Sequence, residues 1–133
     1  NEMLEAHDNF FLVISYNPGY QSVLKDLKES TKQRFLAIDI SYPEATVEQT
    51  IIKVEGNVSD SVAQNLVHVG RLSRNLVGKG LKEGASTRCL IAAATLISKG
   101  FSFSEACDAS VTNVLSDDKD IREGLRQAIN HLI

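Results

Sequence analysis

The hydrophobic pattern of the chain changes at Pro43, and this change constrains the fold more than any other feature. Before it, residues 10–14 and 35–40 are two short, largely apolar runs of the kind that form buried strands. After it, apolar residues recur at helical spacing as far as the end of the chain. The sequence therefore predicts a mainly α fold in two parts: residues 1–43 with two strands and one helix, and residues 44–133 as a helical domain.

Capping residues and glycines set the expected helix boundaries. Ser102 and Glu105 have the spacing of a capping box at the start of one helix. Another helix should begin at Ser86, which can cap it. The other expected helices span residues 24–32, 44–56, 59–77 and 118–132.

Several polar residues on these helices have ordinary structural interpretations. Arg71 and Arg74 stand at i and i+3, and we expect them to share a solvent-facing side of the long helix. The acidic cluster of Asp117, Asp118 and Asp120 suits the start of the last helix better than it suits a metal site.

Composition is that of a folded protein, with 43% hydrophobic and 23% charged residues. The net charge of −3 gives no support for a nucleic-acid or membrane partner. No apolar run approaches the roughly 20 residues of a membrane span. Two cysteines, Cys89 and Cys107, are too few for a disulfide framework or a zinc site. We therefore expect a cytoplasmic protein with no metal site, no nucleic-acid partner and no membrane contact.

The sequence lacks the glycine-rich motif G-x-x-x-x-G-K-[ST] that cradles ATP phosphates. Its Gly78-Lys79 pair is followed by Gly80, and no glycine stands five residues before it. No apolar run ends in a paired Asp-Glu that could hold magnesium. We expect this chain alone to bind neither ATP nor Mg²⁺ tightly and to be inactive.

Three side chains could nevertheless meet a phosphate. Asn17 follows the first predicted strand, at the edge where open α/β sheets bind their ligands, and Arg34 stands directly before the second. Arg88 falls in the first turn of the helix capped by Ser86, where the helix dipole disfavours a cation unless an anion binds. Position alone favours the ordinary interpretations, a turn asparagine and two solvent-facing arginines.

Taken together, these motifs resemble the CbbQ/NirQ/NorQ group of MoxR-type AAA+ ATPases. Residues 11–21 (FLVISYNPGYQ) are similar to the sensor-1 strand and its loop, and residues 24–35 (LKDLKESTKQRF) to the helix leading to the arginine finger. Residues 83–88 (EGASTR) resemble the sensor-2 motif, and residues 115–118 (LSDD) the C-terminal stretch. The resemblance covers the chain from about residue 7, in matching order and spacing.

The resemblance implies that Asn17 is sensor 1, Arg34 the arginine finger and Arg88 sensor 2. Residues 1–43 would end the α/β core, and residues 44–133 would form the helical lid. It also implies a ring hexamer with ATP and Mg²⁺ between subunits, and a partner with a von Willebrand A domain. The implied client is a metabolic enzyme such as Rubisco or a nitrite or nitric oxide reductase. Both Walker motifs would lie before Asn1, which indicates truncation of a longer ATPase.

Two other functions stay open. One is a helical module that binds a protein partner without nucleotide chemistry, and the other is a helix-rich DNA-binding domain, which the acidic composition disfavours. As part of an ATPase, the chain would lack the central strand of its sheet, so the two predicted strands would have unpaired edges. We then expect association or disorder in residues 1–43 and a well-formed helical domain after Pro43.

Overall fold

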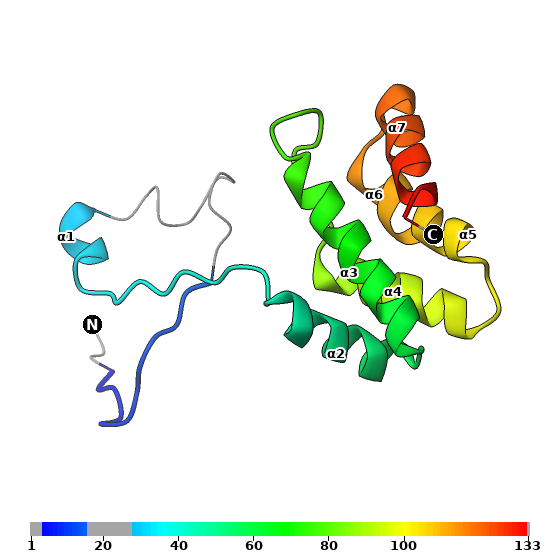
Figure 1. Ribbon diagram of the computed structural model, residues 1–133. Helices are drawn as coiled ribbons and strands as arrows, with labels where there is room; N and C mark the ends of the chain where they lie inside the picture. The colour runs from blue at the N-terminus through cyan, green and yellow to red at the C-terminus, as the bar shows by residue number, and fades with distance from the viewer. Residues whose placement is uncertain (1–3, 16–27, 133) are drawn as a thin grey trace. The chain divides into compact units, whose positions relative to one another are not determined.

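The computed structural model of the chain describes residues 4–15 and 28–132. The chain divides into two units, Asn1–Ile40 and Ser41–Ile133 (Figure 1). The described part of the first unit contains the short helix α1 (Glu29–Lys32), which lies within the predicted helix 24–32. The helical elements of the second unit are α2 (Ala45–Gly56), α3 (Asp60–Asn75), α4 (Thr87–Ser98), α5 (Phe103–Cys107), the π-helical turn η2 (Asp108–Thr112), α6 (Asn113–Leu115) and α7 (Lys119–Asn130).

The two predicted strands do not form. Residues 10–14 and 35–40 have irregular backbone, and the described residues contain an isolated bridge between Val77 and Leu81 but no β-strand. The apolar side chains of these runs face solvent, with Phe11 80% and Leu36 96% exposed. A strand is stable only beside neighbours that pair with its backbone, and the described chain offers these runs none. The mainly α prediction is confirmed, whereas the prediction of a partial α/β core with two strands is wrong.

Four helices of the second unit begin at side chains that cap them, and the caps of α4, α5 and α7 are those that the sequence predicts. Ser59 and Ser86 accept hydrogen bonds from backbone N–H groups in the first turns of α3 and α4. Ser102 and Glu105 form the capping box at α5, and Asp118 caps α7 as expected of the acidic cluster. These side chains satisfy N–H groups that have no partner within the helix.

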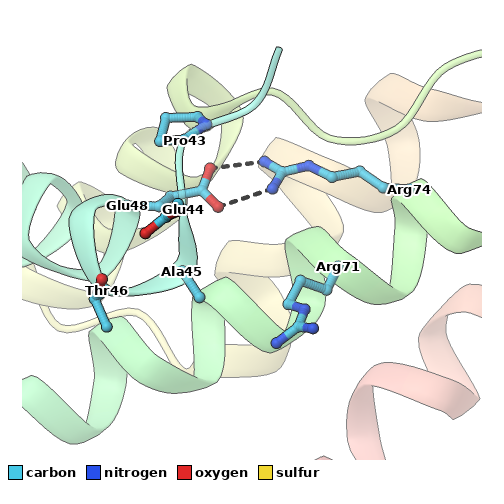
Figure 2. A pocket seen from close by; sticks show the side chains of 7 residues that line it. All are labelled: Pro43, Glu44, Ala45, Thr46, Glu48, Arg71 and Arg74. Carbon is cyan, nitrogen blue, oxygen red and sulfur yellow. Dashed lines mark hydrogen bonds and ion pairs between the residues drawn. The ribbon is translucent and has the colours of Figure 1, made fainter.

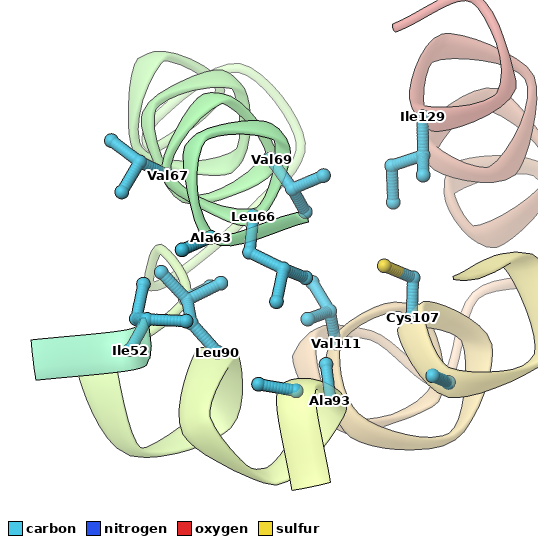
Figure 3. Packing of buried hydrophobic residues seen from close by; sticks show 13 residues of the cluster. Ile52, Ala63, Leu66, Val67, Val69, Leu90, Ala93, Cys107, Val111 and Ile129 are labelled. Atoms are coloured by element: carbon cyan, nitrogen blue, oxygen red, sulfur yellow. The ribbon is translucent and has the colours of Figure 1, made fainter. Parts of the chain in front are cut away.

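The core of the second unit lies between α2, α3 and α4, and continues where α4 meets α5 and η2 (Figure 3). Leu66 and Val69, on the predicted apolar face of α3, are fully buried in it. Gly56 lies where α2 and α4 come closest, because a Cβ at this position would collide with the Cβ of Ala94. The described helices after Pro43 therefore pack into one core.

Candidate functional site

Arg88 lies in the first turn of α4, where the sequence places it. Ser86 is the N-cap of this helix, and its hydroxyl accepts a hydrogen bond of 3.4 Å from the backbone N–H of Cys89. The Arg88 side chain is exposed, and it forms no hydrogen bond or ion pair with any residue that the structure describes. The guanidinium is therefore a solvent-facing cation at the positive end of a capped helix, a place that favours an anion.

The chain that leads from α3 to Arg88 turns at two glycines. Gly78 and Gly80 have φ values of 77° and 121°, which side chains with a Cβ rarely adopt. Leu81, which follows them, is almost fully buried and anchors the loop against the second unit. These glycines follow the helix that the sequence predicts over residues 59–77, and they return the chain to the end of α3.

The segment just before Arg88 is held by the last two turns of α3. The backbone N–H of Ala85 donates to the Ser73 hydroxyl at 3.0 Å, and the Ala85 carbonyl accepts from Nε of Arg74 at 3.0 Å. The backbone of Gly84 runs so close to Arg74 that an added Cβ would lie 2.5 Å from Cγ of Arg74. Both polar backbone groups of Ala85 are thus fixed by side chains of α3.

A buried ion pair connects α3 to α2 at the same place. Arg74 donates from its two terminal nitrogens to the two carboxylate oxygens of Glu48, at 2.8 Å and 2.7 Å (Figure 2). The Thr87 hydroxyl, at the start of α4, donates to the same carboxylate at 2.7 Å. The side chain of Glu48 is 1% exposed and that of Arg74 is 13% exposed. One carboxylate therefore joins three helices.

The position of Arg74 corrects the sequence prediction, which placed Arg71 and Arg74 together on a solvent-facing side of α3. Arg71 is exposed and points away from the Glu48 carboxylate (Figure 2). Arg74 instead turns toward Glu48, because a buried carboxylate strongly favours a cation that can pair with both of its oxygens. The pattern of α3 alone could not show this, since the partner lies on another helix.

Tyr42, which precedes α2, lies against the same arginine. The guanidinium carbon of Arg74 is 3.8 Å from the centre of the Tyr42 ring, which is a cation–π geometry. The phenol hydroxyl donates to the carbonyl of Gly84 at 3.4 Å. Arg74 is therefore in contact with the chain entering α2, with α2 itself and with the segment before α4.

A shallow pocket of about 400 Å³ opens beside this network, at the start of α2 (Figure 2). Glu48 and Arg74 contribute to its wall, and Arg71 lies at its edge without a partner among the described residues. The other lining residues are Pro43, Glu44, Ala45 and Thr46.

The other candidate residues of the sequence lie elsewhere. Asn17 is outside the described residues. Arg34 belongs to the first unit, follows α1 by two residues and is exposed. Since Arg34 and Arg88 lie in different units, their convergence on one ligand stays a prediction.

The cysteines and acidic residues offer no second centre in the described part of the chain. Cys107 is buried, and burial together with the charge of Asp108 raises the pKa of its thiol to about 12, so it stays protonated at neutral pH. No three His, Cys, Asp or Glu side chains of the described residues come close enough together to hold a metal ion. None of the described helices has the length and apolar character needed to cross a membrane.

The network also sets the charge state of Glu48. Burial by itself would raise the pKa of this carboxyl. The hydrogen bonds from Arg74 and Thr87 and the positive charge of Arg74 outweigh burial, so the pKa of Glu48 lies below its ordinary value. The ionised form is therefore favoured in the folded state.

This lowered pKa predicts a loss of stability in acid. Because the unfolded chain binds the proton more readily, the stabilisation is complete above the unfolded pKa of about 4.3 and is lost as the pH falls through the lower folded-state pKa. We expect the free energy of unfolding in urea to fall more steeply with acid in the unaltered chain than in Glu48→Gln, which has no carboxyl at this position. If the free energy of unfolding fell equally steeply with acid in both proteins, the ion pair with Arg74 would not favour the ionised form of Glu48.

The sequence of this chain is similar to that of several known proteins. Residues 48–132 match the family profile described as CbbQ/NirQ/NorQ C-terminal. The chain is 50% identical over 98% of its length to Protein CbbQ of Hydrogenophilus thermoluteolus. It is 48% identical over 88% to Denitrification regulatory protein NirQ of Pseudomonas aeruginosa, and 41% identical over 94% to Protein NorQ of Paracoccus denitrificans. It covers 49%, 45% and 46% of these proteins, so it spans about half the length of the curated relatives that it matches.

Proposed function

Since this chain belongs to the CbbQ/NirQ/NorQ family, we propose that its second unit is the helical lid of an AAA+ ATPase and that Arg88 senses the bound nucleotide. The observation that carries this proposal is the exposed guanidinium of Arg88 in the first turn of a capped helix. The helix dipole there favours a negative ligand, and the preceding segment is fixed by α3. A γ-phosphate is a ligand of the right charge for such a group.

We propose that the phosphates and Mg²⁺ are held by a part of the intact protein that these 133 residues do not include. Two facts support this: the sequence has no phosphate-cradling glycine motif, and the relatives are about twice as long as the matched segment. Asn17 would then orient the attacking water, and Arg34 of one subunit would offset the charge that develops on the γ-phosphate bound by its neighbour. Arg88 would tie the lid to the nucleotide until hydrolysis releases it.

Family membership also suggests what the intact protein assembles with. We propose a cytoplasmic ring of six copies, a partner with a von Willebrand A domain, and a metabolic client that ATP hydrolysis activates, such as Rubisco or a nitrite or nitric oxide reductase. One relative is named as a regulatory protein of denitrification, which supports a client that takes part in denitrification.

Arg88→Ala tests the proposed role of the lid. In the intact protein, we expect this change to raise the KM for ATP by about tenfold, equivalent to the loss of roughly 1.4 kcal/mol of binding. The lid should also stop following the nucleotide, which energy transfer between dyes on the lid and on the rest of the protein would record with ATP and with ADP.

Arg71→Ala is the matched control, because Arg71 is also an exposed arginine of the second unit. It stands 17 residues before Arg88, on a different helix. It should leave both the KM and the dye distances unchanged. If the lid of Arg88→Ala still followed the nucleotide and the KM stayed the same, Arg88 would have no sensing role.

A further inference from the structure

Three hydrogen bonds from α2 and α3 fix the chain immediately before Arg88; Arg74 makes one of them directly and supports a second through Glu48. Its Nε holds the Ala85 carbonyl, and its terminal nitrogens hold the Glu48 carboxylate, which in turn binds the Thr87 hydroxyl. The Ala85 N–H is bound by Ser73, the neighbour of Arg74 on α3. The residues on which the position of Arg88 depends are thus tied, directly or through Glu48, to one end of α3.

We propose that Arg74 is a positioning residue that aims Arg88 at the nucleotide. This inference rests on the proposed function, because it requires that Arg88 bind a phosphate. Arg74 itself would not touch the nucleotide. It acts through the Glu48 carboxylate and the Ala85 carbonyl, which fix the first turn of α4 relative to α2 and α3.

The geometry requires an arginine at position 74. Its planar guanidinium donates in three directions at once, to both carboxylate oxygens of Glu48 and to the Ala85 carbonyl, and its face lies on the Tyr42 ring. A lysine would keep the positive charge and could still pair with Glu48. As a compact point charge on a flexible stem, it could not hold both partners in fixed directions. Arg74→Lys therefore separates the aiming of Arg88 from the neutralisation of Glu48.

Tyr42 places this clamp at the entrance of the lid. It lies two residues after the boundary between the two units, and it contacts both Arg74 and the carbonyl of Gly84. The chain entering α2 and the chain entering α4 are therefore fixed by the same guanidinium. A change in the direction of the entering chain would reach the segment that carries Arg88 through Tyr42, both directly at Gly84 and by way of Arg74.

A double-mutant cycle in the intact protein tests the inference. We expect Arg74→Lys to raise the KM for ATP by roughly three- to tenfold, in the direction of Arg88→Ala. The double variant Arg74→Lys/Arg88→Ala should have the same KM as Arg88→Ala alone, because Arg74 acts only through Arg88. A merely structural arginine would lower the melting temperature without changing the KM of the folded protein.

Arg126→Lys is the matched control, since Arg126 also pairs with carboxylates but does so with Asp108 and Glu123, away from the Arg88 segment. Its KM should stay unchanged. Thr87→Val gives an independent test if Arg74→Lys does not fold. It removes a single hydrogen bond to Glu48 at nearly constant volume. Thr87→Val alone should raise the KM for ATP, as Arg74→Lys does. In the Arg88→Ala background it should not change the KM further.

The possible outcomes separate this inference from the proposed function. If Arg88→Ala raises the KM while Arg74→Lys and Thr87→Val fold and leave it unchanged, the positioning role is wrong and the sensing role stands. If the effects of Arg74→Lys and Arg88→Ala simply add, Arg74 acts on the nucleotide by another route and the inference is also wrong. If Arg88→Ala itself leaves the KM unchanged, both fail together.

Discussion

Arg34→Ala is expected to lower ATP turnover by the intact protein by roughly 10³–10⁵-fold, the contribution of an arginine finger in other nucleotide hydrolases. Arg34 is exposed in the first unit and lies just after α1, as the proposed contact with a neighbouring subunit requires. Because the guanidinium would offset charge that develops only during the reaction, the affinity for ATP should hardly change. Steady-state turnover and nucleotide titration of the same preparation measure the two quantities.

Mixed assemblies of two variants test the proposal that the protein forms a ring in which Arg34 acts across a subunit interface. Arg34→Ala subunits keep Asn17, and Asn17→Ala subunits keep Arg34, so rings made of both contain some complete interfaces. We expect such rings to recover part of the turnover that each variant lacks alone. Lys28→Ala, which removes another exposed cation near α1, should be fully active. Unchanged turnover in Arg34→Ala would remove this residue from the mechanism.

Glu48→Ala is expected to destabilise the helical domain by about 3–5 kcal/mol, because it leaves the guanidinium of Arg74 buried without a counter-charge. It also removes the acceptor of the Thr87 hydroxyl. The free energy of unfolding in urea at neutral pH measures the loss. Lys53→Ala is the control, because it breaks the exposed pair of Lys53 with Asp60 and should cost less than about 1 kcal/mol. Equal losses in the two variants would mean that burial of the Glu48 pair has no energetic consequence.

The helical domain could be predicted from the sequence because its signals are local. Ser59, Ser86 and Ser102 cap helices whose own apolar residues have helical spacing, and no distant partner is needed to interpret them. Local signals could not show that the two predicted strands do not form. Residues 10–14 and 35–40 have the composition of buried strands, but a strand depends on neighbouring strands that the described chain does not contain.

The network around Glu48 was missed because its partners are far apart in the sequence. One signal was available: Glu48 precedes the buried residues Ile52 and Gly56 by four and eight positions, which places it on the buried face of α2. A carboxylate on such a face requires a cation from another element. Which arginine supplies it depends on how α2 and α3 pack, and only the structure shows that it is Arg74.

Hydrogen exchange of the intact protein with a slowly hydrolysed ATP analogue tests most directly whether the segment at Arg88 meets a nucleotide. We predict that saturating analogue slows amide exchange across residues 84–90, and that the slowing disappears in Arg88→Ala. If exchange across this segment stayed the same with and without the analogue, the second unit would not be a nucleotide-sensing lid. A helical module that binds a protein partner would then describe it better.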